Sequence, residues 1–226
     1  MTTQQPQPFP FPREFFFPPF FTRQTNLTTH HAQLVKWSSL ILSYCRHYRI
    51  FKLSLSPVSS STTSNPFSSP TTTSATDGQQ LPQPGSEHLF HNPRIDRRLS
   101  LADIKETIEF MRKDGRAEYV GGGGGGGGTS SGGGGGMGQG GGGGDVVWIY
   151  WRTPEEWASL IEEWVDGTAQ KGTVLTLYEL VEGEGTRGAE FHGLDADLLQ
   201  KALGILVKRG KAQIFGQEDS RGVKFF

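Results

Sequence analysis

Residues 103–120 read DIKETIEFMRKDGRAEYV, and residues 198–215 read LLQKALGILVKRGKAQIF. The two stretches align without a gap, with Gly115 over Gly210. In each copy, apolar residues recur at helical spacing and end at a glycine, which is typical of an amphipathic helix with a left-handed residue after its last turn. A short β-type run follows each glycine. The repeat therefore predicts a unit of helix, turn and strand that occurs twice in the chain.

A second helical pattern precedes each copy of this repeat. In both halves the apolar residues follow the spacing i, i+3, i+4, i+7: Trp37, Leu40, Ile41 and Tyr44, then Trp157, Leu160, Ile161 and Trp164. Another strand pattern closes each half, at residues 146–151 and 222–226. Helix, short middle element, helix and two strands form the winged-helix arrangement. The sequence thus predicts an α+β protein with two tandem winged-helix domains, each of three helices and a β-hairpin wing.

Two low-complexity tracts interrupt the first half. Residues 54–87 are rich in Ser, Thr, Pro and Gln, and residues 121–144 are almost entirely Gly. Neither composition can bury enough apolar surface to offset the entropy of ordering, so we expect disordered insertions, the second within the wing of the first domain. The expected organisation is a flexible tail at 1–13, a first domain at 14–151 and a second at 152–226. A glycine linker between a helical and an α/β domain is the alternative, but it leaves RAEYV without an adjacent partner strand.

Composition limits the possible functions. The chain has 226 residues, a net charge of −1 and a single cysteine, which excludes an intramolecular disulfide and a cysteine-based metal cluster. No apolar run approaches a transmembrane span, and prolines interrupt the Phe-rich start where a signal peptide needs a continuous apolar segment. We therefore expect a cytoplasmic protein that meets membranes only indirectly.

No candidate catalytic or metal site emerges from the reactive side chains. His30 and His31 are adjacent, so on a helix they do not form an i, i+4 metal pair, and we expect both at the surface of the first turn. His192 precedes a helix start without an accompanying nucleophile motif. Cys45 continues the apolar stripe of the first helix and is expected in the core. The sequence thus predicts no enzyme, no cofactor and no metal.

Binding of DNA is the alternative function, since many winged helices bind duplexes with their third helix. Residues 1–151 contain 13 Lys or Arg against 10 Asp or Glu, a balance of +3, whereas residues 152–226 contain 9 against 13, a balance of −4. An acidic second domain repels phosphate. The basic grouping of the first half comprises Arg94, Arg97, Arg98, Arg112, Lys113 and Arg116. A solvated surface explains that grouping better than a phosphate-binding face does, so we expect no nucleic-acid partner.

The stretch EFFFPPFFT, residues 14–22, needs a function of its own. Pro18 and Pro19 lack amide donors and force Phe17 into an extended conformation, so this stretch cannot form an α-helix. Its rings must be buried against another surface. We expect Phe15 or Phe16 to cap the core of the first domain, which leaves the Pro-Pro-Phe-Phe unit for a partner.

Six segments, in this order, resemble the small subunits of the ESCRT-II complex, a family of vacuolar protein sorting-associated proteins: FPPFFT, LFHNPRIDRRL, IYWRTPEEW, LTLYEL, EFHGLD and RGVKFF. The resemblance extends from residue 15 to residue 226 without the two tracts. It implies a non-enzymatic tandem winged-helix protein, present twice in a heterotetramer with one copy of each of two larger winged-helix subunits. Such complexes sort ubiquitinated cargo into multivesicular bodies, so it also implies peripheral recruitment to the endosomal membrane.

The resemblance further implies two partner sites. A Pro-Pro-aromatic motif of the family docks on the larger subunits, and the matching positions are Pro18, Pro19, Phe20 and Phe21. The second winged helix of the family recruits the ESCRT-III subunit that initiates filament assembly. The acidic balance of the second half is consistent with a basic partner segment.

Overall fold

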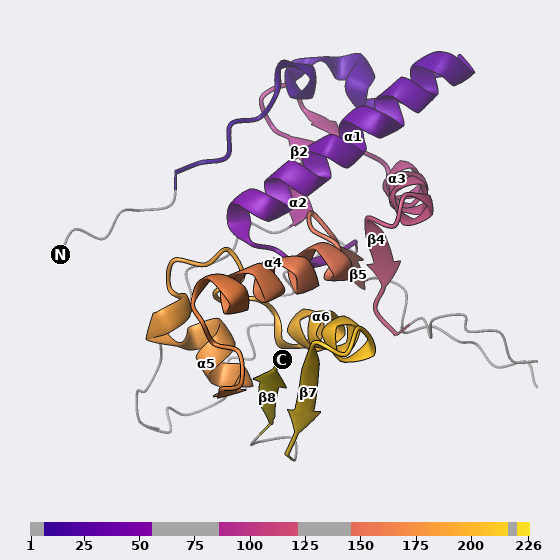
Figure 1. The fold of residues 1–226 in the computed structure, drawn as a ribbon. Coiled ribbons are helices and arrows are strands. Elements are labelled where there is room, and N and C mark those ends of the chain that lie inside the picture. The colour runs from indigo at the N-terminus through magenta and orange to yellow at the C-terminus, as the bar shows by residue number, and fades with distance from the viewer. Residues whose placement is uncertain (1–6, 56–85, 122–145, 217–220) are drawn as a thin grey trace, which may run out of the picture. The chain divides into compact units, whose positions relative to one another are not determined.

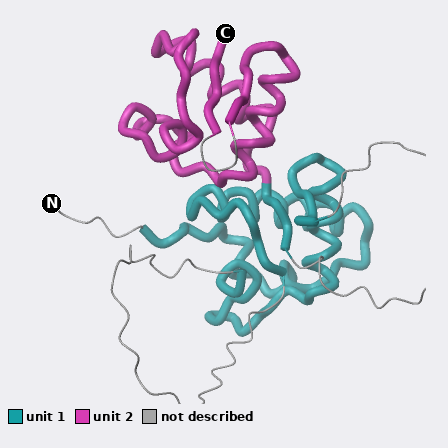
Figure 2. Tube along the Cα trace, turned by 90° about the horizontal axis from the view of Figure 1, so that it is seen from below, with its two compact units in different colours: residues 1–149 teal, residues 150–226 magenta. Residues whose placement is uncertain are grey.

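The computed structural model describes residues 7–55, 86–121, 146–216 and 221–226. Most of the two expected insertions lies outside these residues. The chain divides into two compact units, unit 1 (Met1–Ile149) and unit 2 (Tyr150–Phe226), which are coloured separately in Figure 2. Each unit is a winged helix, so the predicted fold class is confirmed.

The elements of unit 1 appear in this order (Figure 1): η1 (Arg13–Phe16), η2 (Pro18–Phe21), α1 (Leu27–Tyr48), β1 (Lys52–Ser54), α2 (Ser86–Phe90), β2 (His91–Asn92), β3 (Arg97–Arg98), α3 (Leu101–Lys113), β4 (Ala117–Tyr119) and β5 (Val146–Ile149). Those of unit 2 are α4 (Pro154–Gly167), β6 (Val174–Thr176), α5 (Leu177–Glu182), η3 (Glu184–Thr186), α6 (Ala196–Lys208), β7 (Ala212–Phe215) and β8 (Gly222–Phe225). Ordered structure therefore extends slightly into the first expected insertion, because Ser54 ends β1 and α2 begins at Ser86.

The strand pairing predicted across the glycine tract is confirmed. β4 and β5 are antiparallel, with Ala117 opposite Ile149 and Tyr119 opposite Val147. The wing sheet of each unit has three strands instead of the expected two, in the orders β1-β5-β4 and β6-β8-β7, and β2 and β3 form a separate two-stranded sheet in unit 1. β1 and β6 are only three residues long, and a run of that length carries too little alternation to be recognised in the sequence.

Local signals set the ends of the helices. The side chains of Ser100 and Asp195 accept backbone N–H groups at the starts of α3 and α6. Thr176 and Glu179 form a capping box on α5. The glycine after each repeated helix has a positive φ, 67° at Gly115 and 70° at Gly210, which a residue with a side chain rarely adopts.

The core of each unit lies between its first and third helices and its sheet. In unit 1, α1 packs on α3, and in unit 2, α4 packs on α6. The apolar stripe predicted on α1 is buried, including Trp37, Ile41 and Cys45. Phe225 is buried, whereas Phe226 is half exposed and lies beyond the last residue of β8.

Candidate functional site

Residues 7–23, here called the aromatic segment, lie against α1 and begin at its C-terminal end. The amide of Phe9 donates to the Tyr48 hydroxyl at 3.0 Å, and the Phe9 ring meets the Tyr44 ring edge-on. His47 Nε2 is 2.8 Å from the carbonyl oxygen of Gln7. Residues 7–13, expected as part of a flexible tail, are therefore ordered by contacts with α1.

Three rings of the aromatic segment fasten it to the core of unit 1. Phe15 is buried, in agreement with the expectation for Phe15 or Phe16, and Phe20 and Phe21 are only 6% and 5% exposed. The Phe20 ring stacks on Trp37 with centroids 4.4 Å apart, and the Trp37 indole N–H donates to the Phe20 carbonyl at 3.0 Å. Phe20 and Phe21 were expected to reach a partner groove. In the structure their rings are buried in the core of their own domain.

Four consecutive residues in the middle of the segment face solvent: Phe16, Phe17, Pro18 and Pro19, here called the Phe-Pro tetrad. The Phe16 and Phe17 side chains are 41% and 59% exposed, and both prolines are exposed as well. Two short 3₁₀ turns, η1 and η2, flank Phe17, which is extended with φ −107° and ψ 112°, as Pro18 requires. The change of direction between the turns buries Phe15 and Phe20 while it presents Phe17 outward.

A groove separates the aromatic segment from the exposed face of α1. It has two hollows of about 420 Å³ and 180 Å³, both lined by Glu14, Phe20 and Lys36. Lys36 Nζ and Glu14 Oε1 form an ion pair at 2.8 Å between these hollows. The hydrogen bond from Lys36 holds the pKa of Glu14 below its usual value. Phe17 and Pro19 line the smaller hollow, so the groove adjoins the Phe-Pro tetrad.

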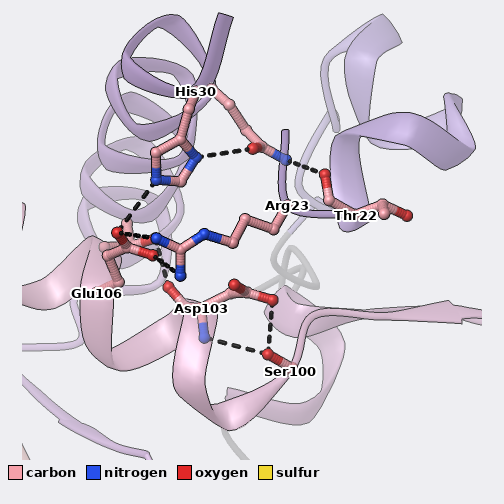
Figure 3. A network of polar contacts seen from close by, with 8 residues as sticks. Thr22, Arg23, His30, Ser100, Asp103 and Glu106 are labelled. Atoms are coloured by element: carbon pink, nitrogen blue, oxygen red, sulfur yellow. Dashed lines mark hydrogen bonds and ion pairs between the residues drawn. The ribbon is translucent and has the colours of Figure 1, made fainter. Parts of the chain in front are cut away.

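Polar contacts fix the C-terminal end of the segment (Figure 3). The buried Gln33 amide donates to the Phe20 carbonyl oxygen at 2.8 Å and to the Thr22 carbonyl oxygen at 2.9 Å, and Figure 3 draws the second of these contacts. Arg23 pairs with Glu106 of α3 through two N···O contacts of 3.0 Å. His30 lies between them, with Nδ1 3.5 Å from Gln33 Oε1 and Nε2 3.1 Å from Glu106 Oε1. His30 was expected at the surface, but its side chain is only 13% exposed.

The β2–β3 hairpin supports the tetrad from another side. The Asn92 amide donates to the Phe15 carbonyl at 2.6 Å, and β3 contacts η2. The Arg94 guanidinium lies 5.4 Å from the centre of the Phe16 ring. Arg97 and Arg98 are exposed on β3. Part of the basic grouping found in the sequence therefore borders the Phe-Pro tetrad.

Helix α3 does not present a basic surface suited to DNA. Asp103, Glu106 and Glu109 are interleaved with its cations, and Arg112 pairs with Glu109 at 2.7 Å. Phosphate would meet carboxylates along this helix, and repulsion from them opposes binding. These contacts give no support to the DNA-binding alternative.

The other reactive side chains have structural partners. His192 Nδ1 lies 3.1 Å from the Thr186 hydroxyl, which also donates to the Gly183 carbonyl. Among the residues that the structure describes, no group of three His, Cys, Asp or Glu side chains could hold a metal ion. Within the same residues, no helix is long and apolar enough to cross a membrane.

Cys45 is expected to be chemically inert in the folded protein. Its side chain is fully buried, and burial raises the pKa of its thiol because the thiolate would lose hydration. Ellman's reagent should therefore label the native chain at least about a hundredfold more slowly than the chain unfolded in guanidinium. A Cys45→Ala/Ser43→Cys variant, with its thiol on the exposed side of α1, should react at once. Rapid labelling of native Cys45 would contradict the buried position.

The sequence identified the segment but not which of its rings are exposed. Phe16 and Phe17 were not assigned to the partner site, whereas Phe20 was. The relevant signal is the proline at position 18, which fixes Phe17 as the extended link between two turns. Gln33 and Glu106 were missed entirely, because nothing local distinguishes them from other polar helix residues.

Comparison with known proteins gives a consistent result. A family model described as "ESCRT-II complex subunit" matches residues 14–195. Curated proteins named vacuolar protein-sorting-associated protein 25 are 41% identical in Dictyostelium discoideum, with 97% of each chain covered, and 36% identical in Homo sapiens, with 96% of this chain and 98% of the relative covered.

Solved structures show the same likeness. A crystal structure of subunit VPS25 of ESCRT-II is similar with a TM-score of 0.67 and 27% identity, over 95% of this chain and 98% of that one. A chain in the crystal structure of the endosomal complex ESCRT-II, described as VPS22/VPS25/VPS36, is similar with a TM-score of 0.66 and 28% identity over the same shares.

Proposed function

The chain belongs to the family of ESCRT-II complex subunits, and we propose that it docks on the two larger subunits of that complex through the Phe-Pro tetrad. It recruits the ESCRT-III initiating subunit through unit 2, in the sorting of ubiquitinated cargo into multivesicular bodies. In this proposal the assembly is a heterotetramer with two copies of this chain and one copy of each larger subunit, for which we take VPS22 and VPS36, the proteins named beside VPS25 in the solved ESCRT-II complex. The chain is a non-enzymatic, cytoplasmic adaptor that reaches the endosomal membrane through the complex.

The exposure of the tetrad is the observation that carries the docking role. Phe17 is 59% exposed although it sits in a segment whose neighbouring rings are buried. An exposed ring beside two prolines offers apolar area on a backbone that is already restrained, and this lowers the entropy lost on binding. Pro18 and Pro19 contact the partner directly in this arrangement. Phe20 and Phe21 pack on Trp37 and so hold the two prolines in place on unit 1.

Electrostatics add a requirement on the partner. Arg94, Arg97 and Arg98 border the tetrad, and no ion pair joins any of them to a carboxylate within the described part of the chain. A groove with carboxylates at its rim would complement these guanidinium groups and accelerate encounter. The partner surface is therefore apolar at its centre and acidic at its edge.

Unit 2 offers a separate surface on its sheet. Val174 and Phe215 are exposed, and a Cβ atom added at Gly222 would meet the rim of the Phe215 ring at 2.9 Å and Val174 Cγ1 at 3.5 Å. Both side chains thus cover the same glycine on the outer face of β6-β8-β7, here called the wing face. Its apolar area, together with the balance of −4 over residues 152–226, fits an amphipathic segment with basic residues.

Reconstitution with purified subunits separates the two roles. The full chain should form a stable complex with VPS22 and VPS36, and Phe215→Asp should leave this assembly intact while it weakens capture of the ESCRT-III subunit about tenfold. Gln213→Asp, two residues away on the same strand, is the matched control and should have little effect. Equal loss in both variants would point to charge alone, and no loss in either would remove the wing face from the proposal.

A further inference from the structure

We propose that Arg23, Gln33, His30 and Glu106 form a polar latch that keeps the aromatic segment closed, so that the Phe-Pro tetrad is held in the conformation its partner binds. The inference rests on the proposed docking role and concerns its regulation. These four side chains come from the segment itself, from α1 and from α3 (Figure 3).

Gln33 is the inner half of the latch. Its amide group donates to two backbone carbonyls, those of Phe20 and Thr22. These two residues lie at the C-terminal end of η2, so Gln33 holds that end against α1. The Phe20 carbonyl also accepts from Trp37. Without the Gln33 donors, the buried carbonyl of Phe20 would keep one partner and the Thr22 carbonyl would lose its contact with α1. The backbone immediately after Pro19 could then move away from α1.

Arg23 and Glu106 form the outer half. The Arg23 side chain is 60% exposed and that of Glu106 is 32% exposed, so this ion pair can open to water without disturbing the core. When this ion pair is formed, it joins the C-terminal end of the aromatic segment to α3. Among the contacts described, no other hydrogen bond or ion pair links the segment to α3. His30 joins the two halves, because it faces Gln33 on one side and Glu106 on the other.

The aromatic segment is thus fastened at both ends, by Phe9 and His47 near its start and by the latch near its finish. The Phe-Pro tetrad lies between these two groups of contacts. When the latch opens, only the molecules that are still closed can bind, and the observed association rate constant is the intrinsic one multiplied by the closed fraction. The dissociation rate is unchanged, since none of the latch side chains touches the partner.

Charge reversal tests the latch directly. Arg23→Glu and Glu106→Arg should each slow association with VPS22 or VPS36 about three- to tenfold in biolayer interferometry, with unchanged dissociation. The double variant Arg23→Glu/Glu106→Arg restores an ion pair and should bind within about twofold of the unmodified chain. Arg112→Glu, which breaks the exposed pair with Glu109 on the same helix, is the matched control and should not change the rates.

A second measurement requires no partner. Hydrogen exchange of the free chain should increase at the amides of residues 15–17 and 20–23 in each single reversal and return to normal in the double variant. If single reversals bind and exchange like the unmodified chain, or if the double variant is as slow as the singles, the latch is wrong. If the latch variants are neutral while Phe17→Ala/Pro19→Ala weakens binding, the docking role stands and only the latch fails. If the tetrad variant itself is neutral, the docking role fails.

Discussion

Replacement of Phe17 and Pro19 by alanine is expected to weaken binding to each larger ESCRT-II subunit by about 30- to 150-fold, which corresponds to about 2 to 3 kcal/mol. Burial of an exposed Phe ring contributes about 1.5 to 3 kcal/mol, and loss of Pro19 returns conformational freedom to the unbound segment. Both side chains are exposed, so their removal should leave the unit folded. Isothermal titration calorimetry against VPS22 and VPS36 separately gives the two affinities.

Leu27→Ala is the matched control for this variant. Leu27 is 83% exposed at the start of α1, so it is an apolar surface residue of the same unit outside the tetrad. Its replacement should change neither affinity nor thermal stability by a measurable amount. Undiminished binding by Phe17→Ala/Pro19→Ala would refute the docking assignment. Equal loss in Leu27→Ala would mean that the tetrad is not the specific contact.

Trp37→Ala is expected to have the largest effect on stability, a loss of about 3 to 5 kcal/mol for unit 1. The indole is buried, stacks on Phe20, meets Phe21 edge-on at 5.4 Å and donates to the Phe20 carbonyl. Its removal therefore leaves a cavity under the aromatic segment and removes one of the two hydrogen bonds that the Phe20 carbonyl accepts. Hydrogen exchange measures this loss in peptides of α1 and α3 after partial denaturation in urea.

Trp37→Phe separates the contributions of the ring and the hydrogen bond. It keeps an aromatic partner for Phe20 and loses the indole N–H, so its cost should be smaller, about 1 to 2 kcal/mol. Peptides of unit 2 provide an internal reference, because their exchange should not change. Protection of α1 in Trp37→Ala equal to that of the unmodified chain would show that the segment does not depend on this ring.

The stability prediction also determines how binding experiments are designed. Phe20 and Phe21 lie in the core, so Phe20→Ala would lower binding through loss of structure even if the ring never touched a partner. Variants of Phe17 and Pro19 avoid this ambiguity. The distinction depends on burial, which the run of phenylalanines did not reveal.

Much of the fold could be predicted because its signals are local. The helix stripe at Trp37, the cap at Ser100 and the positive φ at Gly115 depend on side chains within a few residues of one another. The pairing of β4 with β5 was also predictable, since both strands follow recognisable patterns on either side of the glycine tract. β1 and β6 were not, because three residues give no reliable periodicity.

The sequence by itself determined that the chain contains two winged helices and that an aromatic, proline-rich segment precedes the first helix. These properties follow from spacing and backbone chemistry, which are fixed by neighbours along the chain. Only the tertiary structure decided that Phe20 is buried while Phe17 is exposed, and that Arg23 meets Glu106. Those outcomes depend on how α1 and α3 surround the segment, and contacts between residues 83 positions apart leave no local trace in a single sequence.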